Sequence, residues 1–387
     1  MCLPLQLTSV PKQIIHVLRW PSLRICTMAS TSASGLIKTY STLFNTHTPG
    51  HNPHRTYFEI QSRQSPRAAE NDSDDADDNL DEALDDLITK TWDVWAASPL
   101  YGMKWNEEVK LKQYAKRLRE NVATSLCKED VSYDAEFLIL KDLVRSRSHQ
   151  PAIKVLVYSN KDDSEKENCI YTGIFLSWGS ELDSEQENLK LPIVLTRGGQ
   201  TVTQAIHVIL CQMFDCVITA MPASQEDLMW LTAVILNSSN PSDLSVQRKK
   251  KQVTSADALT LEYRIPGLPT SDLILVQFPI SCMIALWFKI CPTQQSLTNP
   301  REQIESRVYL EQIEKFNQFI RLQLLNNMDL ELGYCLLSKI SLPSLTIKAN
   351  KIKCKNIDTL DRVLWYFQEK ALLYMAFLTQ MNIDEAE

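Results

Sequence analysis

Apolar and polar residues follow their most regular pattern between Leu191 and Leu236, which we take as the centre of a folded domain. Residues 191–195 form a short apolar run typical of a strand, and Gly198 and Gly199 end it. Thr201 and Gln204 have capping-box spacing, which predicts that a helix begins there. A second strand over residues 216–220 and a helix that opens at Pro222 and Ser224 complete a strand–helix–strand–helix order. The expected apolar face of the first helix carries Val202, Ala205, Ile206, Ile209, Leu210 and Met213.

Upstream of this centre, the pattern predicts two helices and a hairpin. The first helix continues the acidic run of residues 70–86 and carries its apolar face into Trp92 and Trp95. The second helix spans residues 107–122 after the turn at Pro99. Its candidate buried positions are Val109, Leu111, Tyr114, Leu118 and Val122. Residues 133–143 fit a strand or a helix, whereas residues 153–158 and 169–178 predict an antiparallel hairpin with a charged loop.

Downstream of the centre, the chain alternates again between strands and helices. The pattern predicts a strand over residues 272–278, a short helix over residues 281–290 and a long amphipathic helix opening at Asn299 and Pro300. Strands fit residues 329–337, 344–348 and 350–355. A final helix rich in large apolar side chains is expected over residues 359–378.

Composition describes an ordinary globular chain with unevenly placed charge. The 387 residues are 44% hydrophobic and 22% charged, and no apolar run is long enough to span a bilayer. The net charge of −7 hides an acid-free stretch up to Phe58 and a dense acidic run over residues 70–86. Ten cysteines occur without a CxxC pair, so we expect reduced thiols in an intracellular protein and no zinc site.

The N-terminal residues lack the pattern of a folded domain. Residues 41–66 are rich in Ser, Thr, His and Pro, a composition that predicts a disordered tail, which we extend to residue 80. The acid-free start with its arginines resembles a mitochondrial transit peptide. The alternative is that Met28 is the usual start and that the residues before it are dispensable. A mitochondrial protein of unknown activity therefore stays open as a second hypothesis.

The chain carries no recognisable catalytic motif. The Gly198-Gly199 turn before a helix offers backbone N–H groups to a phosphate, but neither GxxxxGK[ST] nor GxGxxG is present. We expect a tight turn there, with a small-molecule-binding α/β domain as the alternative. His207 is expected at the surface, on the face opposite Ile206 and Ile209. The sequence thus predicts a protein that is not an enzyme and uses no cofactor, metal or small-molecule substrate.

Two basic clusters are the candidate functional residues. The first lies in a polar loop and consists of Arg248, Lys249, Lys250 and Lys251. The second alternates along the predicted strands and consists of Lys348, Lys351, Lys353 and Lys355. Lysines along one face of a strand suit contact with the phosphates of DNA, which needs charge and reach but no base reading. The alternative is a solvated edge strand whose lysines prevent aggregation.

Several segments resemble the centromere protein L family. The segment LITKTWDVWAASPLYGMKW resembles its Trp-bearing segment followed by a Ser/Thr-Pro-Leu-Tyr turn, and CIYTGIFLSWGSE resembles its Thr-Gly hairpin strand. LPIVLTRGG and MFDCVITAMPASQEDLMWLTAVI are similar to its Leu-Pro strand, its Phe-Asp-Cys strand and the following helix. NKIKCK and the apolar C-terminal helix also fit. The resemblance covers residues 87–378 in patches and leaves out the tail and most of residues 237–268.

The resemblance implies a fold and a structural role in the nucleus. The implied fold is α+β, a curved and mainly antiparallel sheet with flanking helices, preceded by the disordered tail. The implied function is that of a subunit of the constitutive centromere-associated network at the inner kinetochore. The implied partners are centromere protein N as a heterodimer, centromere protein C and other inner-kinetochore subunits, and the DNA of the centromeric nucleosome, without a membrane. On this basis the expected partner contacts are Leu345, Ile347, Ile352, Trp365 and Tyr366.

Four segments summarise the expected organisation. Residues 1–80 form the tail, and residues 81–240 form an N-terminal α/β part. Residues 241–265 form a basic surface loop. Residues 266–387 form a C-terminal α/β part that is used for heterodimerisation.

Overall fold

A long sheet with helices on both faces organises the molecule. The computed structural model describes residues 15–19, 57–60, 74–127, 131–145, 150–161, 168–178, 188–238, 257–269, 272–291 and 306–384. The helices are α2 (Asp74–Asp85), α3 (Glu108–Leu126), α4 (Gln200–Phe214), α5 (Gln225–Asn237), α7 (Ile280–Ile290), α8 (Leu310–Met328) and α9 (Ile357–Asp384). The strands are β1 (Ile15–Arg19), β2 (Tyr57–Ile60), β3 (Trp92–Ala97), β4 (Val131–Leu140), β5 (Ala152–Lys161), β6 (Asn168–Leu176), β7 (Ile193–Gly198), β8 (Ile218–Ala220), β9 (Ala258–Arg264), β10 (Leu273–Pro279), β11 (Ser306–Tyr309), β12 (Leu336–Ser341), β13 (Leu345–Lys348) and β14 (Lys351–Cys354).

Among the described residues, the main sheet has twelve strands and is not closed into a barrel. Its order is β1-β10-β9-β12-β13-β14-β3-β7-β6-β5-β4, and β8 also pairs with β3. The β1–β10 pair is parallel and the other pairs are antiparallel. β2 and β11 form a separate two-stranded sheet. The predicted α+β class, with a mainly antiparallel sheet and flanking helices, is confirmed.

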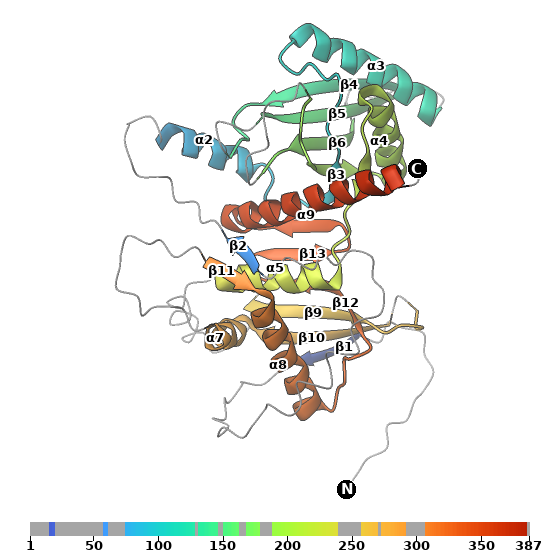
Figure 1. Ribbon diagram of the computed structural model, residues 1–387. Helices are drawn as coiled ribbons and strands as arrows, with labels where there is room; N and C mark the ends of the chain where they lie inside the picture. Colours follow the sequence, from blue (N-terminus) through green and yellow to red (C-terminus); the bar gives the residue numbers. More distant parts are fainter. Residues whose placement is uncertain are drawn as a thin grey trace.

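Strands from the two ends of the folded chain meet in the middle of the sheet. β14 pairs with β3 through Ile352 opposite Trp92 and Lys351 opposite Asp93. One half of the sheet therefore comes from residues 92–220 and the other largely from residues 258–354. We call the β3–β14 pair, where the two halves join, the seam. Helix α9 lies across the seam, as Figure 1 shows, and contacts β3, β7 and β14. Helix α5 packs against β12 and α7, so it belongs to the packing of the second half.

The sheet separates two hydrophobic cores. In β7, Val194 packs toward α3 and α4, while Ile193 and Leu195 pack on the other face, toward α9. Alternate side chains of one strand therefore enter different cores, as the two-residue period of a strand requires. Helices α2, α5, α7, α8 and α9 contribute to the second core, which also runs under β9 to β14.

Buried polar contacts connect α9 to the first half of the sheet. Gln368 has no exposed surface, and its Oε1 accepts the backbone N–H of Trp178 and, at 3.4 Å, the hydroxyl of Ser177. The indole N–H of Trp178 donates to Asp361 Oδ1 at 3.0 Å. Because these groups are removed from water, each hydrogen bond is costly to lose. They orient α9 across the seam.

Most predicted elements are present, with shifted ends. The helix predicted over residues 107–122 is α3, and the hairpin of residues 153–158 and 169–178 is β5 and β6. Residues 133–143, which fitted either state, mainly form β4. The helix predicted to open at Ser224 is present and is capped there, because the Ser224 hydroxyl accepts the N–H of Asp227 while the Asp227 carboxylate accepts the N–H of Ser224.

Several local predictions are wrong. Trp92 and Trp95 lie in strand β3, which pairs on both sides, and not in a continued helix. Helix α4 begins at Gln200 with Gly199 as its N-cap, so Thr201 caps nothing. The helix expected at Asn299 begins at Leu310, after β11 has paired with β2. Val109 is 67% exposed because α3 turns it away from the sheet.

The tail and the basic loop fall largely outside the described residues. Within residues 1–80, the structure describes β1, β2 and the first residues of α2. The residues from 239 to 256, which include Arg248, Lys249, Lys250 and Lys251, lie outside it.

Candidate nucleic-acid interface

One face of the second half of the sheet carries no helix among the described residues. Leu345, Ile347, Ile352 and Cys354 of β13 and β14 point into the core under α5 and α9. The residues that alternate with them point to the opposite side. We call this side the bare face and define it by Glu262, Lys339, Lys348, Lys351 and Lys353. The predicted alternation of Lys348, Lys351 and Lys353 with apolar residues is present.

A row of lysines crosses the bare face with a carboxylate at each end. Lys339, Lys348 and Lys351 are successive cross-strand partners on β12, β13 and β14. Glu262 of β9 is the partner of Lys339, and its carboxylate lies 2.9 Å from Lys348 Nζ and 3.7 Å from Lys339 Nζ. At the other end, Asp93 Oδ1 lies 3.2 Å from Lys351 Nζ. The two carboxylates offset the repulsion that adjacent like charges produce.

Lys353 and, just beyond the end of β14, Lys355 carry the least compensated charge in this region. Both side chains are exposed, and in the described part of the chain neither has a carboxylate within ion-pair distance. Lys353 faces Thr346 across the hairpin, and the backbone N–H of Lys355 donates to the carbonyl of Ser344. Four of the eight predicted DNA-contact residues are thus brought to one region, and DNA contact by them stays a prediction.

Sequence reasoning missed Lys339, Glu262 and Asp93 as members of this surface. The strand predicted over residues 329–337 ended before Lys339, whereas β12 runs from Leu336 to Ser341. Glu262 and Asp93 come from strands far away in the chain, so only the register of the sheet brings them to the lysines. The alternating apolar residues of each strand were the available signal for their orientation.

The five predicted partner-contact residues lie mostly inside this chain. Leu345, Ile347, Ile352 and Tyr366 are buried, and the Tyr366 hydroxyl donates to Asp227 Oδ1 at 2.8 Å. Trp365 is half-buried, with the guanidinium of Arg145 4.5 Å from its ring centroid. These residues hold α9 and the β13–β14 hairpin in place, and their contact with a partner stays a prediction.

His207 is buried, contrary to the surface position expected from the sequence. It is 4% exposed, with Nε2 3.2 Å from the Tyr171 hydroxyl and its ring edge-to-face with Trp95 at 4.5 Å. Helix α4 turns this position toward β6 and β3, so the apolar face is wider than the predicted stripe. Burial disfavours the charged imidazolium and lowers the pKa of His207 to about 4.

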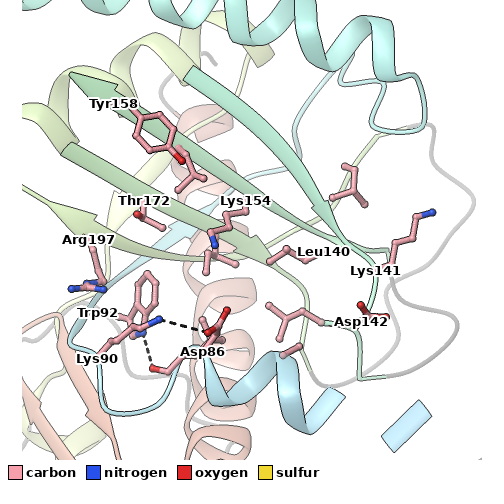
Figure 2. Close-up of a pocket in the computed structure, with 16 residues that line it drawn as sticks. Asp86, Lys90, Trp92, Leu140, Lys141, Asp142, Lys154, Tyr158, Thr172 and Arg197 are labelled. Carbon is pink, nitrogen blue, oxygen red and sulfur yellow. Dashed lines mark hydrogen bonds and ion pairs between the residues drawn. The ribbon is translucent and has the colours of Figure 1, made fainter. Parts of the chain in front are cut away.

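A hollow of about 460 Å³ lies on the other face of the first half of the sheet, between α2 and β4 to β7. Figure 2 shows its centre, where Trp92 and Arg197 lie side by side and Lys154 points from the sheet toward α2. We call it the Trp92 groove. Gly198 and Gly199 do not line it. A Cβ at Gly198 would lie 2.7 Å from the carbonyl oxygen of Ile170, so this glycine permits close strand packing.

Two further properties bear on the kind of protein. Within the ranges described above, no helix is both long and apolar enough to cross a bilayer. The same residues contain no group of three His, Cys, Asp or Glu side chains that could hold a metal ion.

The class of protein is therefore an α+β protein built on one long open sheet, with a lysine-bearing bare face. Residues 86–372 match the family model of Centromere protein L, and the chain belongs to this family. The match includes the seam, the bare face and most of α9.

A curated relative supports the same family. Centromere protein L of Xenopus tropicalis is 22% identical to this chain over 163 residues, which are 38% of this chain and 46% of the relative. The matched region thus spans about half the length of that relative. As a member of this family, the chain is a nuclear protein of the centromere and kinetochore. The mitochondrial alternative is accordingly set aside.

Proposed function

We propose that this chain is a non-enzymatic scaffold subunit of the inner kinetochore, in the constitutive centromere-associated network. It pairs with centromere protein N and contacts centromere protein C and other inner-kinetochore subunits. The pair uses the lysines of the bare face to hold the DNA of the centromeric nucleosome. The loop residues Arg248, Lys249, Lys250 and Lys251 add to the same DNA contact.

The observation that supports DNA contact is the arrangement of lysines on the bare face. Lys348, Lys351 and Lys353 lie on adjacent strands, with Lys339 beside them and Lys355 at the end of β14. No acidic residue occurs within β12, β13 or β14. Lysine supplies a mobile point charge suited to phosphates, without selecting a base.

The test is a salt titration of DNA binding by the complex with centromere protein N. The double variant Lys353→Glu/Lys355→Glu removes the two least compensated charges. We expect weaker binding of duplex DNA and a slope of log K against log salt that is lower by about two, since each phosphate contact contributes about 0.9. The control Lys112→Glu/Lys116→Glu reverses two exposed charges on α3. An unchanged slope in the first variant rejects the bare face as the DNA contact.

Exposed apolar side chains support heterodimerisation through residues 266–387. Of the fifteen large apolar side chains that are exposed among the described residues, ten lie in this segment. Phe319 and Leu322, one turn apart on α8, are 46% and 44% exposed. Stable interfaces bury such groups at their centre. We expect Phe319→Asp/Leu322→Asp to reduce copurification with centromere protein N, while Val109→Asp on α3 does not. Equal copurification of both variants counts against this surface.

A further inference from the structure

We propose that the Trp92 groove binds an acidic peptide segment of another protein, with one large apolar side chain of that peptide lying over the floor of the groove. The groove lies on the face of β4 to β7 opposite α3 and α4, so it is separate from the bare face and from the DNA contact proposed above. The site goes beyond the scaffold function, because it gives the chain a peptide ligand of defined chemistry.

The floor of the groove is apolar and fixed. Leu87, Trp92 and Ile174 line it and are each 3% exposed. The indole N–H of Trp92 donates to the carbonyl of Leu87 at 2.9 Å, so the ring is held in one orientation. A floor that is already ordered binds an apolar side chain without further ordering cost.

The rim is cationic where it adjoins the sheet. Lys154 on β5 and Arg197 on β7 both line the groove, and the Arg197 guanidinium lies 5.7 Å from the centroid of the Trp92 ring. In the described part of the chain, neither side chain has a carboxylate within ion-pair distance. Lys154 is half-buried between Leu138 and Ile174 on the neighbouring strands. Two cations beside an apolar floor are complementary to carboxylates that flank a bulky side chain.

The dimensions of the groove favour a peptide over a nucleic acid. A volume of about 460 Å³ accommodates one or two large side chains. On the α2 side, Asp86 lines the groove and lies 3.9 Å from Lys90, and Asp142 lies near the end of β4. Lys90 and Lys141 line the same side, so its charges are balanced, whereas the sheet side carries two cations. An acidic peptide therefore places its carboxylates over the sheet.

The experiment is a selection of random twelve-residue peptides on the full chain, followed by affinity measurement on the enriched sequences. We expect enrichment of Phe, Trp or Leu flanked by Asp or Glu. For one enriched peptide labelled with fluorescein, anisotropy should give at least a tenfold loss of affinity for Lys154→Glu/Arg197→Glu. A similar loss is expected when the peptide's apolar anchor is replaced by Ser.

Two further variants distinguish a loss of peptide affinity from a folding defect of the charge-reversal variant. Lys154→Gln/Arg197→Gln removes the charges without reversing them and should weaken binding about threefold or more. Thr172→Trp fills the groove from β6 and should also weaken it. The charge-matched control Lys112→Glu/Lys116→Glu on α3 should change peptide affinity less than twofold.

Three results overturn the proposal. The first is a selection that enriches no peptide or enriches basic ones. The second is an enriched peptide whose affinity is the same for the Lys154 and Arg197 variants. The third is duplex DNA that binds the chain and loses affinity in the Lys154 and Arg197 variants, while acidic peptides do not bind. That result would make the groove a nucleic-acid surface.

Discussion

The Lys351 ammonium lies 3.2 Å from the Asp93 carboxylate, across the strand pair that joins the two halves of the sheet. The two residues are 258 positions apart in the chain. Their ion pair ends the lysine row of the bare face, so the same residue that closes the seam also belongs to the proposed DNA contact. Stability and the proposed DNA contact therefore share Lys351.

The ion pair predicts unequal effects of two substitutions at this residue. Lys351→Ala should lower the free energy of unfolding by about 0.5 kcal/mol at most, because the lysine side chain is 61% exposed and such pairs are weak. Lys351→Glu should lower it further, since two carboxylates then face each other. Urea unfolding of both variants measures this. The swap Asp93→Lys/Lys351→Glu should recover part of the loss, and no recovery would show that the pair does not interact.

Glu262 is expected to restrain DNA binding by the bare face. Its carboxylate, 4% exposed, pairs with both Lys339 and Lys348. Glu262→Gln should release these two lysines and make the salt slope of DNA binding steeper by about one. The substitution should also lower stability by about 1 kcal/mol, because a charged hydrogen bond is lost. Unchanged salt dependence with lowered stability would place the DNA elsewhere.

The buried His207 predicts a loss of stability in acid. Its pKa is lowered from 6.5 to about 4, so the unfolded chain binds a proton between these values and the folded chain does not. The contribution is fully present above pH 6.5 and declines as the pH falls toward 4. At about 1.4 kcal/mol per pKa unit, the loss reaches about 3 kcal/mol. Unfolding between pH 7 and pH 4 measures it.

His207→Gln is the matched control for this pH dependence, because glutamine does not titrate and can still bond to the Tyr171 hydroxyl. Its stability should change less between pH 7 and pH 4 than that of the natural chain. An identical pH dependence would assign the acid sensitivity to other groups.

Gln368 is expected to be the most sensitive polar position of α9. Gln368→Ala leaves the backbone N–H of Trp178 without its buried acceptor, which should cost about 2–3 kcal/mol. Leu373→Ala on the same helix removes an apolar side chain that is 44% exposed and should cost less than 1 kcal/mol. Thermal unfolding compares the two. Equal effects would mean that α9 is not held by this hydrogen bond.

Cys211 is expected to be more reactive than the buried cysteines. A hydrogen bond from the Cys216 side chain lowers the pKa of the half-buried Cys211 thiol below its usual value, while burial raises the pKa of Cys354 to about 12. Since the thiolate is the nucleophile, iodoacetamide at pH 7.5 should modify Cys211 well before Cys354. Mass spectrometry of peptides follows both sites. Cys216→Ala should slow the reaction at Cys211, and an unchanged rate would contradict the role of that hydrogen bond.

Local periodicity was enough to predict several elements and part of the candidate site. The positions of α3, the β5–β6 hairpin and α5 follow from apolar spacing and from the Ser224 cap, because these signals lie within about twenty residues of chain. The alternation of Lys351 and Lys353 with Ile352 likewise indicated that both lysines share one face of a strand. The family resemblance, resting on short segments in the right order, was confirmed by the match over residues 86–372.

Tertiary structure alone decided which neighbours these elements have. Trp92 and Trp95 have a spacing that suits a helix, but β3 forms because β14, β7 and β8 supply hydrogen-bond partners from distant parts of the chain. The burial of His207, the pairing of Lys351 with Asp93 and the Trp92 groove arise in the same way. Each depends on sheet register between residues far apart, and a local pattern carries no information about register.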